Sequence, residues 1–394
     1  MLSEIDAAVQ AAAPAIVQLR HEFHQHPEIR YEEKWTSDRV SRYLDEIGVS
    51  HRRGLAKGTG ILATIEGNGP RTVLLRGDMD ALEIQEETGL PYASTIPGRM
   101  HACGHDGHTA CLLGVARVLS ECRHLLQGTV RLAFQPAEEE AAAGRFMVQD
   151  GAVDGADAAF ALHGWPTLPV GKIGLREGYA LAGADVFWIT VHGRGCHAAD
   201  PAAGVDPVLV AAHITTALQS LVSREIQPHD AGVVTVASIH AGTATNIIAD
   251  TAVMAGTFRS FDPKVRETLA MGIQRIATTV AQAFRATAEV SLSENVYPPL
   301  QNDPGMTQFV RETAKEAISP DCVVEMEKPF MGAEDFAYYL QKVPGTFICL
   351  GVNSNHEGGY PPLHNSRYDF SDAAVPIAMK LMSSIAVKFL ARQS

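Results

Sequence analysis

The sequence predicts an α/β protein with a mostly parallel sheet and helices on both faces, into which a smaller α+β domain is inserted. Two observations support this prediction. From about residue 60, short apolar runs alternate with helical segments, which is typical of strand–helix–strand units around a parallel sheet. Between residues 183 and 297 the order changes to β-α-β-β-α-β, the ferredoxin-like split βαβ arrangement.

The first domain is expected to comprise residues 1–182 and 298–394, because segments of the same kind resume near residue 301. Apolar residues at helical spacing between Ile5 and Phe23 predict an N-terminal helix, which Pro14 should kink or divide. Four apolar runs predict strands and one run rich in Ala and Leu predicts a helix: strands 61–65, 72–75, 129–134 and 158–162, and helix 107–119.

The inserted domain is expected at 183–297. Its pattern predicts four strands and two helices: strands 185–191, 232–239, 251–258 and 288–292, and helices 207–222 and 263–285. A sheet of this kind has an exposed edge strand, and such edges are commonly paired or covered. We therefore expect the insert to join two copies of the chain through its edge strand or a neighbouring helix.

Composition and charge exclude several classes of protein. The 394 residues are 46% apolar and 20% charged, which are ordinary globular values. The net charge of −13 and the absence of a Lys/Arg run argue against nucleic-acid binding. Six cysteines are too few for a disulfide scaffold, and no apolar run reaches the roughly 18 residues of a membrane helix. We expect a cytoplasmic protein that binds neither nucleic acid nor a membrane.

Acidic residues and histidines follow the predicted strands of the first domain. Four strands, at 72–75, 129–134, 158–162 and 347–350, lead in chain order to Asp78 and Asp80, to Glu138 through Glu140, to His163, and, through a loop rich in Gly, Asn and Pro, to His364. In an open α/β sheet, ligands bind outside the carboxyl ends of the strands. Four strand ends that deliver such residues to one rim predict a polyvalent site, with unrelated loop residues as the alternative interpretation.

Residues of metal-binding types are concentrated between His101 and His108, where a helix is expected to begin. Eight residues hold three histidines, one cysteine and one aspartate, and Gly104 would let the backbone bend so that Cys103 and His105 converge on one ion. Imidazole and thiolate suit Zn, Ni, Co or Mn better than Mg or Ca. The spacing is not that of a structural zinc knuckle. A helix cap or a buried polar cluster is the alternative interpretation.

Three consecutive glutamates, Glu138 to Glu140, follow the strand at 129–134. By themselves they could be a solvated acidic turn, because a helix start favours carboxylates. Metal-assisted hydrolysis, however, needs one carboxylate as a ligand and a second, unbound carboxylate as general base. Adjacent glutamates leave the backbone in different directions and can divide those roles.

Seven motifs follow one another along nearly the whole chain: Arg76-Gly-Asp-Met-Asp80, His101-Ala-Cys-Gly-His-Asp-Gly-His108, Phe134-Gln-Pro-Ala-Glu-Glu139, Gly193-Arg-Gly-Cys-His-Ala-Ala199, Thr245-Asn-Ile-Ile-Ala-Asp250, Gly332-Ala-Glu-Asp-Phe336 and Leu363-His-Asn365. Together they resemble the peptidase M20 family, in its branch of N-acyl-amino-acid amidohydrolases. That branch includes hippurate hydrolases, aminoacylases and auxin-conjugate hydrolases.

The resemblance implies two divalent metal ions per subunit (Zn, Mn, Ni or Co) on the first domain, and an inserted lid that mediates dimerisation. By position, the family's metal ligands fall on Cys103, His105, Glu139, His163 and His364. Cys103 is the best candidate to bridge the two ions. Two further residues are implied in catalysis, Glu138 as the general base and Asp80 as the acidic residue behind the metals. Asp78 is a weaker candidate for a supporting position.

The resemblance also implies three substrate-binding residues in the insert. His197 matches the lid histidine that reaches a substrate oxygen, often across the dimer. Asn246 and Arg259 match groups near the substrate carboxylate, which an arginine can grip with two hydrogen bonds. Without the resemblance, a loop histidine, a turn asparagine and a surface arginine would be the simpler interpretation of all three.

The expected reaction is metal-dependent hydrolysis of the amide bond of a small N-acyl amino acid, as in hippurate hydrolases and aminoacylases, by a homodimer or a higher homo-oligomer. The products are a carboxylic acid and a free amino acid. The nearest alternative is a dipeptidase or aminopeptidase with the same binuclear centre. A non-catalytic metal-stabilised binding protein is another, and a hydrolase with Cys103 as nucleophile beside His105 is a third. Chelation should abolish a metal reaction and spare a thiol nucleophile.

Overall fold

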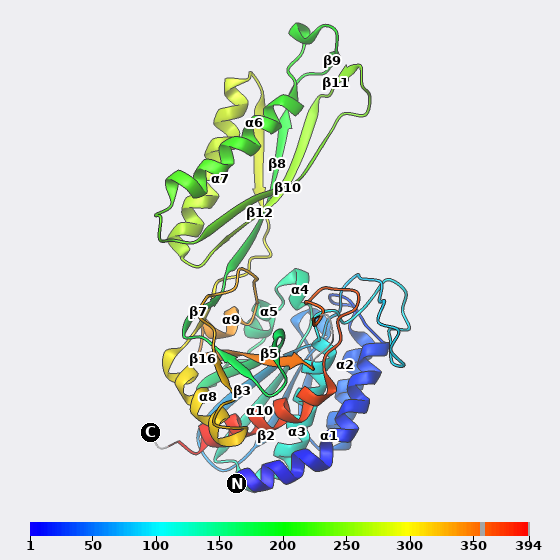
Figure 1. Cartoon of the computed structure of the whole chain (residues 1–394), viewed down its shortest axis with the longest axis vertical. Helices are drawn as coiled ribbons and strands as arrows, with labels where there is room; N and C mark the ends of the chain where they lie inside the picture. The colour runs from blue at the N-terminus through cyan, green and yellow to red at the C-terminus, as the bar shows by residue number, and fades with distance from the viewer. Residues whose placement is uncertain (355–358, 393–394) are drawn as a thin grey trace. The chain divides into compact units, whose positions relative to one another are not determined.

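The chain divides into two compact units in a computed structural model that describes residues 1–354 and 359–392 (Figure 1). Unit 1 comprises Met1–Ala180, Gln301–Pro329 and Asp335–Ser394. Unit 2 comprises Leu181–Leu300 and the short segment Phe330–Glu334. Unit 2 thus extends slightly beyond residues 183–297 at both ends and includes a segment that begins about 30 residues later in the chain.

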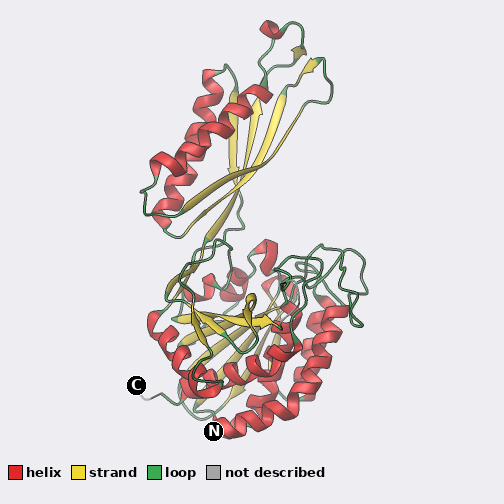
Figure 2. Cartoon of the chain, in the orientation of Figure 1, coloured by secondary structure: helices red, strands yellow, loops and turns green. Residues whose placement is uncertain are grey.

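Unit 1 is built on an eight-stranded sheet with the order β1-β2-β4-β3-β5-β16-β6-β15 (Figure 2). Four neighbouring pairs are parallel and three are antiparallel, so the sheet is mixed but mostly parallel, which confirms the predicted α/β class. Its strands are β1 Ser50–Leu55, β2 Gly60–Glu66, β3 Arg71–Asp78, β4 Gly128–Gln135, β5 Ala158–Pro169, β6 Ile173–Leu175, β15 Val323–Glu325 and β16 Gly345–Asn353.

Helices cover both faces of this sheet. One face shares a continuous apolar core, which includes Leu75 and Phe160, with five helices: α1 Leu2–Gln25, α2 Lys34–Glu46, α3 His105–Glu121, α8 Pro304–Ala317 and α10 Val375–Leu390. Successive strand residues point to opposite faces. Arg76, which follows Leu75 on β3, therefore points to the other face, where it contacts Asp335 and where the short helices α5 Gly144–Gln149 and α9 Ala337–Leu340 lie.

One helix among the described residues, Asp372–Leu390, is long and apolar enough to meet the length and composition criteria for a membrane span. Seventy-two per cent of that apolar window is buried inside the fold, where α10 packs beside α1 and α3. A buried core helix passes the same test.

Unit 2 is an antiparallel sheet, β10-β12-β8-β13, with two helices on one face. Its elements are β8 Gly183–His192, α6 Pro207–Ser220, β10 Gly232–Ala241, β12 Thr251–Ser260, α7 Pro263–Ala283 and β13 Thr287–Leu292, in the expected order β-α-β-β-α-β. The opposite face of the sheet exposes apolar side chains, among them Val186, Trp188 and Val253.

Both long helices of unit 2 begin with the dipeptide Asp-Pro. The carboxylates of Asp206 and Asp262 accept hydrogen bonds from main-chain N–H groups of the first turn. Proline at the first helical position has no N–H to satisfy and a suitable φ. These caps explain why both helices start where they do.

Helix α1 runs without interruption from Leu2 to Gln25 although Pro14 lies inside it, so the prediction that Pro14 could divide the helix is wrong. Pro14 is exposed, whereas Ile5, Val9 and Ile16 on the opposite side are buried in the core. Burial of this apolar side outweighs the main-chain hydrogen bond that proline cannot donate.

Replacement of Pro14 by alanine should therefore stabilise the protein. The substitution restores a main-chain donor in the middle of α1, and we expect a gain of about 1–2 kcal/mol, less than the full helix-propensity difference of roughly 3 kcal/mol because alanine makes the unfolded chain more flexible. Thermal unfolding measures the effect, with Ala11→Pro at another exposed position of α1 as the destabilising control. A lower melting temperature for Pro14→Ala than for the wild type would contradict this account.

Candidate metal centre

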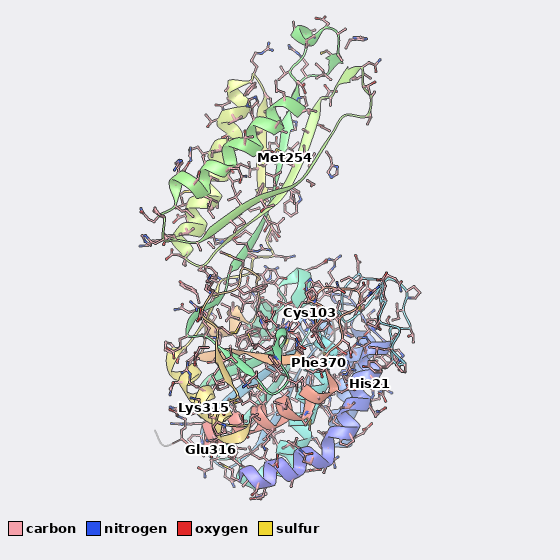
Figure 3. The ribbon with its side chains drawn as sticks, viewed as in Figure 1. His21, Cys103, Met254, Lys315, Glu316 and Phe370 are labelled. Atoms are coloured by element: carbon pink, nitrogen blue, oxygen red, sulfur yellow. The ribbon has the colours of Figure 1, made fainter. Side chains whose placement is uncertain are left out.

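Residues that the sequence places at strand ends converge around Cys103, which is labelled in Figure 3. Three overlapping groups have ligand atoms within 4.8 Å of one another: Cys103 with His105 and His163, Cys103 with Glu139 and His364, and His105 with Glu138 and Glu139. The structure therefore brings together in unit 1 all five predicted ligands and the predicted general base.

The backbone bends sharply at Gly104, as expected, with φ of +86°. This left-handed conformation lets Cys103, before the bend, and His105, the first residue of α3, approach the same point. Glycine is also needed for space, because a Cβ at Gly104 would lie 2.9 Å from the Tyr368 hydroxyl.

The three glutamates occupy different environments on α4, a single turn at Glu138–Ala141. The side chain of Glu139 is 8% exposed and faces His105 and His364. Glu138 is buried, and its carboxylate accepts a hydrogen bond from the main-chain N–H of Asp335. Glu140 is half exposed and pairs with Arg30 at the surface. The simple solvated-turn interpretation therefore fits Glu140 and not its two neighbours.

His163 lies inside β5, so the prediction that this strand ends at residue 162 is wrong. The strand continues to Pro169 because β16 pairs with it in parallel through Trp165 and again at Pro169. His163 Nδ1 donates to the carbonyl of Gly164 at 2.9 Å, which leaves Nε2 without a proton, 3.4 Å from Cys103 Sγ. Burial lowers the pKa of His163 well below its usual value, so the ring is neutral and suited to ligate a metal.

His364 reaches the cluster from a loop of which residues 355–358 lie outside the described part of the chain. Its backbone is left-handed, with φ of +64°, and its N–H donates to Ala102. Its Nε2 lies 3.2 Å from Glu139 Oε1. Burial opposes ionisation of Glu139, but the hydrogen bond from His364 and the charge of His105 outweigh it and lower the pKa of this carboxyl.

Two aspartates orient the histidines of α3. Asp80 accepts from His105 Nδ1 at 3.2 Å and from the Glu139 N–H at 3.0 Å, so it holds two predicted ligands at once. Asp78 Oδ1 lies 2.6 Å from His108 Nδ1. Burial lowers the pKa of His105, but Asp78 and Asp80 more than offset it and raise that pKa to about 10. Carboxylate–histidine pairs of this kind are common behind metal ligands.

The donor set fits a divalent cation. His105 Nε2 is buried and has no hydrogen-bond partner within the described residues, which is costly unless another group satisfies it. Burial, together with Glu139 and Glu138, raises the pKa of Cys103 well above its usual value, and a bound cation would favour the thiolate instead. Sulfur, imidazole and carboxylate donors together suit Zn, Mn, Ni or Co.

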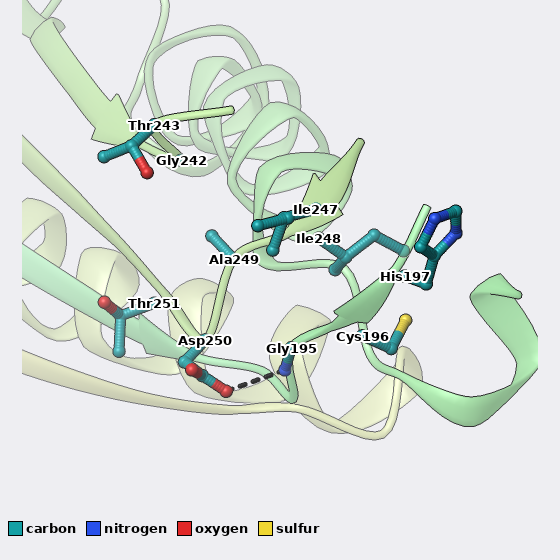
Figure 4. Close-up of a pocket in the computed structure, with 10 residues that line it drawn as sticks. All are labelled: Gly195, Cys196, His197, Gly242, Thr243, Ile247, Ile248, Ala249, Asp250 and Thr251. Carbon is teal, nitrogen blue, oxygen red and sulfur yellow. Dashed lines mark hydrogen bonds between the residues drawn. The ribbon is translucent and has the colours of Figure 1, made fainter. Parts of the chain in front are cut away.

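Two of the three predicted substrate-binding residues lie together in unit 2. His197, on β9 (Cys196–His197), pairs with β11 (Ile247–Ile248), and the carbonyl of Asn246 accepts from Ala198. The loops beside them, 195–197, 242–243 and 247–251, line a cavity of about 640 Å³ (Figure 4). His197 Nδ1 accepts from the Ala199 N–H at 3.1 Å, so its exposed ring carries its proton on Nε2.

Arg259 lies elsewhere in unit 2. It is half-buried on β12 and pairs with Ala184, whereas the end of β12 that follows β11 is Thr251. Eight residues of extended strand span about 26 Å. The structure therefore does not bring Arg259 near His197 and Asn246 within one chain.

Several buried polar residues around the cluster had no role in the sequence prediction. These are Glu33, Arg76, His108, Gln135 and Asp335. All except Glu33 lie within one of the seven motifs, so the motifs could have identified them as candidates. Nothing in the local sequence identifies Glu33, which meets the cluster only after folding.

Comparison with known proteins gives the family and the relatives that the chain resembles. Residues 74–388 match the peptidase family M20/M25/M40. The chain is 41% identical to an N-acetyl-L-cysteine deacetylase of Bacillus subtilis over 88% of this chain and 82% of that protein. It is 38% identical to thermostable carboxypeptidase 1 of Saccharolobus solfataricus over 95% of each. The crystal structure of a dinuclear metal-binding M20 peptidase from Bacillus subtilis superposes with a TM-score of 0.82 at 34% identity, covering 97% of this chain and 99% of that one.

A divalent ion should stabilise the metal-stripped protein against heat. A ligand that binds only the folded state at 1,000 times its Kd contributes about 4 kcal/mol. We expect the melting temperature to rise on titration with Zn, Mn, Co or Ni, and Cys103→Ser to lose most of this rise. Cys111→Ser, at another buried cysteine outside the clustered groups, should keep it. An unchanged rise in Cys103→Ser would remove that residue from the metal site.

Proposed function

The chain belongs to peptidase family M20/M25/M40 as a metal-dependent amidohydrolase or peptidase, and we propose that it hydrolyses the amide bond of N-acyl amino acids, including substrates of the hippurate hydrolase and aminoacylase type. The observation that carries the proposal is that Glu139 faces two histidines, while Glu138 is buried beside it, accepts from the Asp335 N–H and has a carboxylate oxygen within 4.8 Å of His105 and Glu139. The deacetylase relative supports an acyl amino acid as the substrate class.

We propose that Cys103, His105, Glu139, His163 and His364 would hold two divalent ions. Cys103 is the candidate for a shared ligand, because its thiol lies within 4.8 Å of a ligand atom of each of the other four. Bound there, the ions would polarise the scissile carbonyl and make a water molecule more acidic. Asp80 then acts through His105 and Glu139, whose orientations it fixes.

Glu138 is the proposed general base. It accepts a proton from the attacking water and returns it to the leaving amine. Its burial keeps the carboxylate in a medium where proton transfer is not diverted to bulk water. His197, with its proton on Nε2, is suited to donate a hydrogen bond to the oxyanion, and Asn246 or Arg259 to hold the substrate carboxylate.

We further propose that the protein works as a homodimer, or a higher homo-oligomer, joined through unit 2 as a lid. The outer strands of its sheet, β10 and β13, present main-chain groups that a second copy can pair or cover. His197 lies on β9, which pairs with β11, whereas Arg259 lies near the far end of β12. This separation within one chain favours a site that takes His197 from one copy and Arg259 from the other.

A peptide substrate is the second candidate. The carboxypeptidase relative favours it, and the same centre would serve a dipeptidase or an aminopeptidase. A panel of N-acetyl and N-benzoyl amino acids and dipeptides separates the candidates. Preference for the acyl substrates supports the main proposal, and preference for the peptides overturns it.

Replacement of Glu138 by glutamine should remove most turnover without removing metal. Loss of a general base costs about 10²–10⁴-fold in rate. Activity and metal analysis are measured on the same samples. Glu140→Gln, the same change on the exposed neighbour, is the matched control and should stay near wild type. Loss of metal from Glu138→Gln would instead make Glu138 a ligand, and full activity would reject both roles.

Mixed dimers test whether His197 acts across the interface. Glu138→Ala and His197→Ala chains, each inactive alone, are dissociated together and allowed to reassociate. If His197 serves the partner, one of the two sites in a mixed dimer is intact and activity partly returns. Each variant taken alone through the same procedure is the control. Mixed dimers that form but stay inactive would place His197 in its own subunit's site.

A further inference from the structure

One buried carboxylate holds both ends of the turn that carries Glu138 and Glu139. Gln135, the last residue of β4, donates from Nε2 to Asp335 Oδ1 and Oδ2 at 2.8 Å each. Gly144, the first residue of α5, donates its main-chain N–H to Asp335 Oδ2 at 2.7 Å. Asp335 comes from a segment about 200 residues later in the chain and has no exposed surface.

The turn between these anchors is strained. Ala137 and Ala142, directly before and after α4, are both left-handed, with φ of +51° and +49°. This conformation is unfavourable for a residue with a Cβ. At the Ala137 end, Glu33 accepts the main-chain N–H at 2.9 Å. On the Ala142 side, the bond from Gly144 to Asp335 anchors the chain two residues later.

Asp335 also contacts the proposed base directly, since its own N–H donates to Glu138 Oε1 at 3.4 Å. Its charge is balanced by Arg76, whose Nη2 lies 2.9 Å away. Arg76 in turn donates to Gln135 and pairs with Asp78. Arg76 therefore holds the Asp335 carboxylate from the side away from the turn.

We propose that Asp335 is a positioning residue that keeps the Glu138 turn in its strained conformation by anchoring the chain beyond Ala142. The inference rests on the proposed role of Glu138. Asp335 lies behind the turn and works through Glu138 rather than by contact with substrate. Loss of the Asp335 carboxylate should therefore lower kcat by a larger factor than it raises KM.

The first test is Asp335→Asn. If the turn relaxes at Ala142, the productive conformer becomes rarer by about 10-fold, the equivalent of roughly 1.4 kcal/mol. We expect kcat to fall by about that factor or more, while KM changes less than about twofold and metal content stays near wild type. A higher KM with an unchanged kcat would overturn the proposal.

Rescue separates positioning from general damage. Glycine adopts positive φ freely. Ala142→Gly in the Asp335→Asn background should recover at least about threefold in kcat. Ala141→Gly, one position earlier in the helical turn, is the matched control and should recover nothing. Equal recovery from both substitutions, or from neither, would contradict the proposed anchor.

Hydrogen exchange gives a readout that does not depend on the substrate. Amides of residues 137–144 should exchange faster in Asp335→Asn than in the wild type. Gln135→Met, which removes two of the anchoring bonds and keeps the buried charges, should show the same change to a smaller extent. Faster exchange in a protein that hydrolyses no acyl amino acid would refute the proposed function and keep the anchor. Unchanged exchange and kcat in an active protein would refute the anchor alone.

Discussion

The buried guanidinium of Arg76 is the interaction on which the rest of the site depends. It lies between two carboxylates, Asp78 and Asp335, and none of the three side chains has exposed surface. Removing such charges from water is favourable only when each is paired and hydrogen-bonded. Asp78 also contacts the ring of His108, and the main-chain N–H of Asp335 donates to Glu138. The guanidinium of Arg76 thus links the residues that hold α3 in place to those that hold α4 in place.

This arrangement concentrates carboxyl groups in a small volume. Burial raises the pKa of Asp335 to about 6, although Arg76 opposes the shift, and burial with the nearby Asp80 raises that of Glu33 to about 8. For Asp78, the charge of Arg76 outweighs burial and lowers the pKa. A divalent cation bound beside these groups would favour the ionised carboxylates, so folding and metal binding are expected to support each other.

Four strands of unit 1, β2 to β5, and the order of elements in unit 2 were predictable from periodicity, and so was the position of the acidic residues and histidines at one rim of the sheet. The length of β5 was not, because it depends on pairing with β16, which the local sequence of 158–169 does not encode. The continuity of α1 through Pro14 is likewise a tertiary effect of its buried side. The anchoring by Asp335 and Glu33 follows from contacts between distant segments, and the separation of Arg259 from Asn246 follows from strand register.

The interruption of unit 1 by unit 2 has a consequence for synthesis on the ribosome. The chain emerges from its N-terminus, and domains generally fold as units as they appear. The segment that makes up most of unit 2 is complete when residue 300 has emerged, but unit 1 still lacks β16, α10, Asp335 and His364. The central pairing of β5 with β16 must therefore wait for nearly the whole chain. The nascent protein cannot assemble the full ligand set early, and the part of the apolar core that α8 and α10 complete stays without these helices until then.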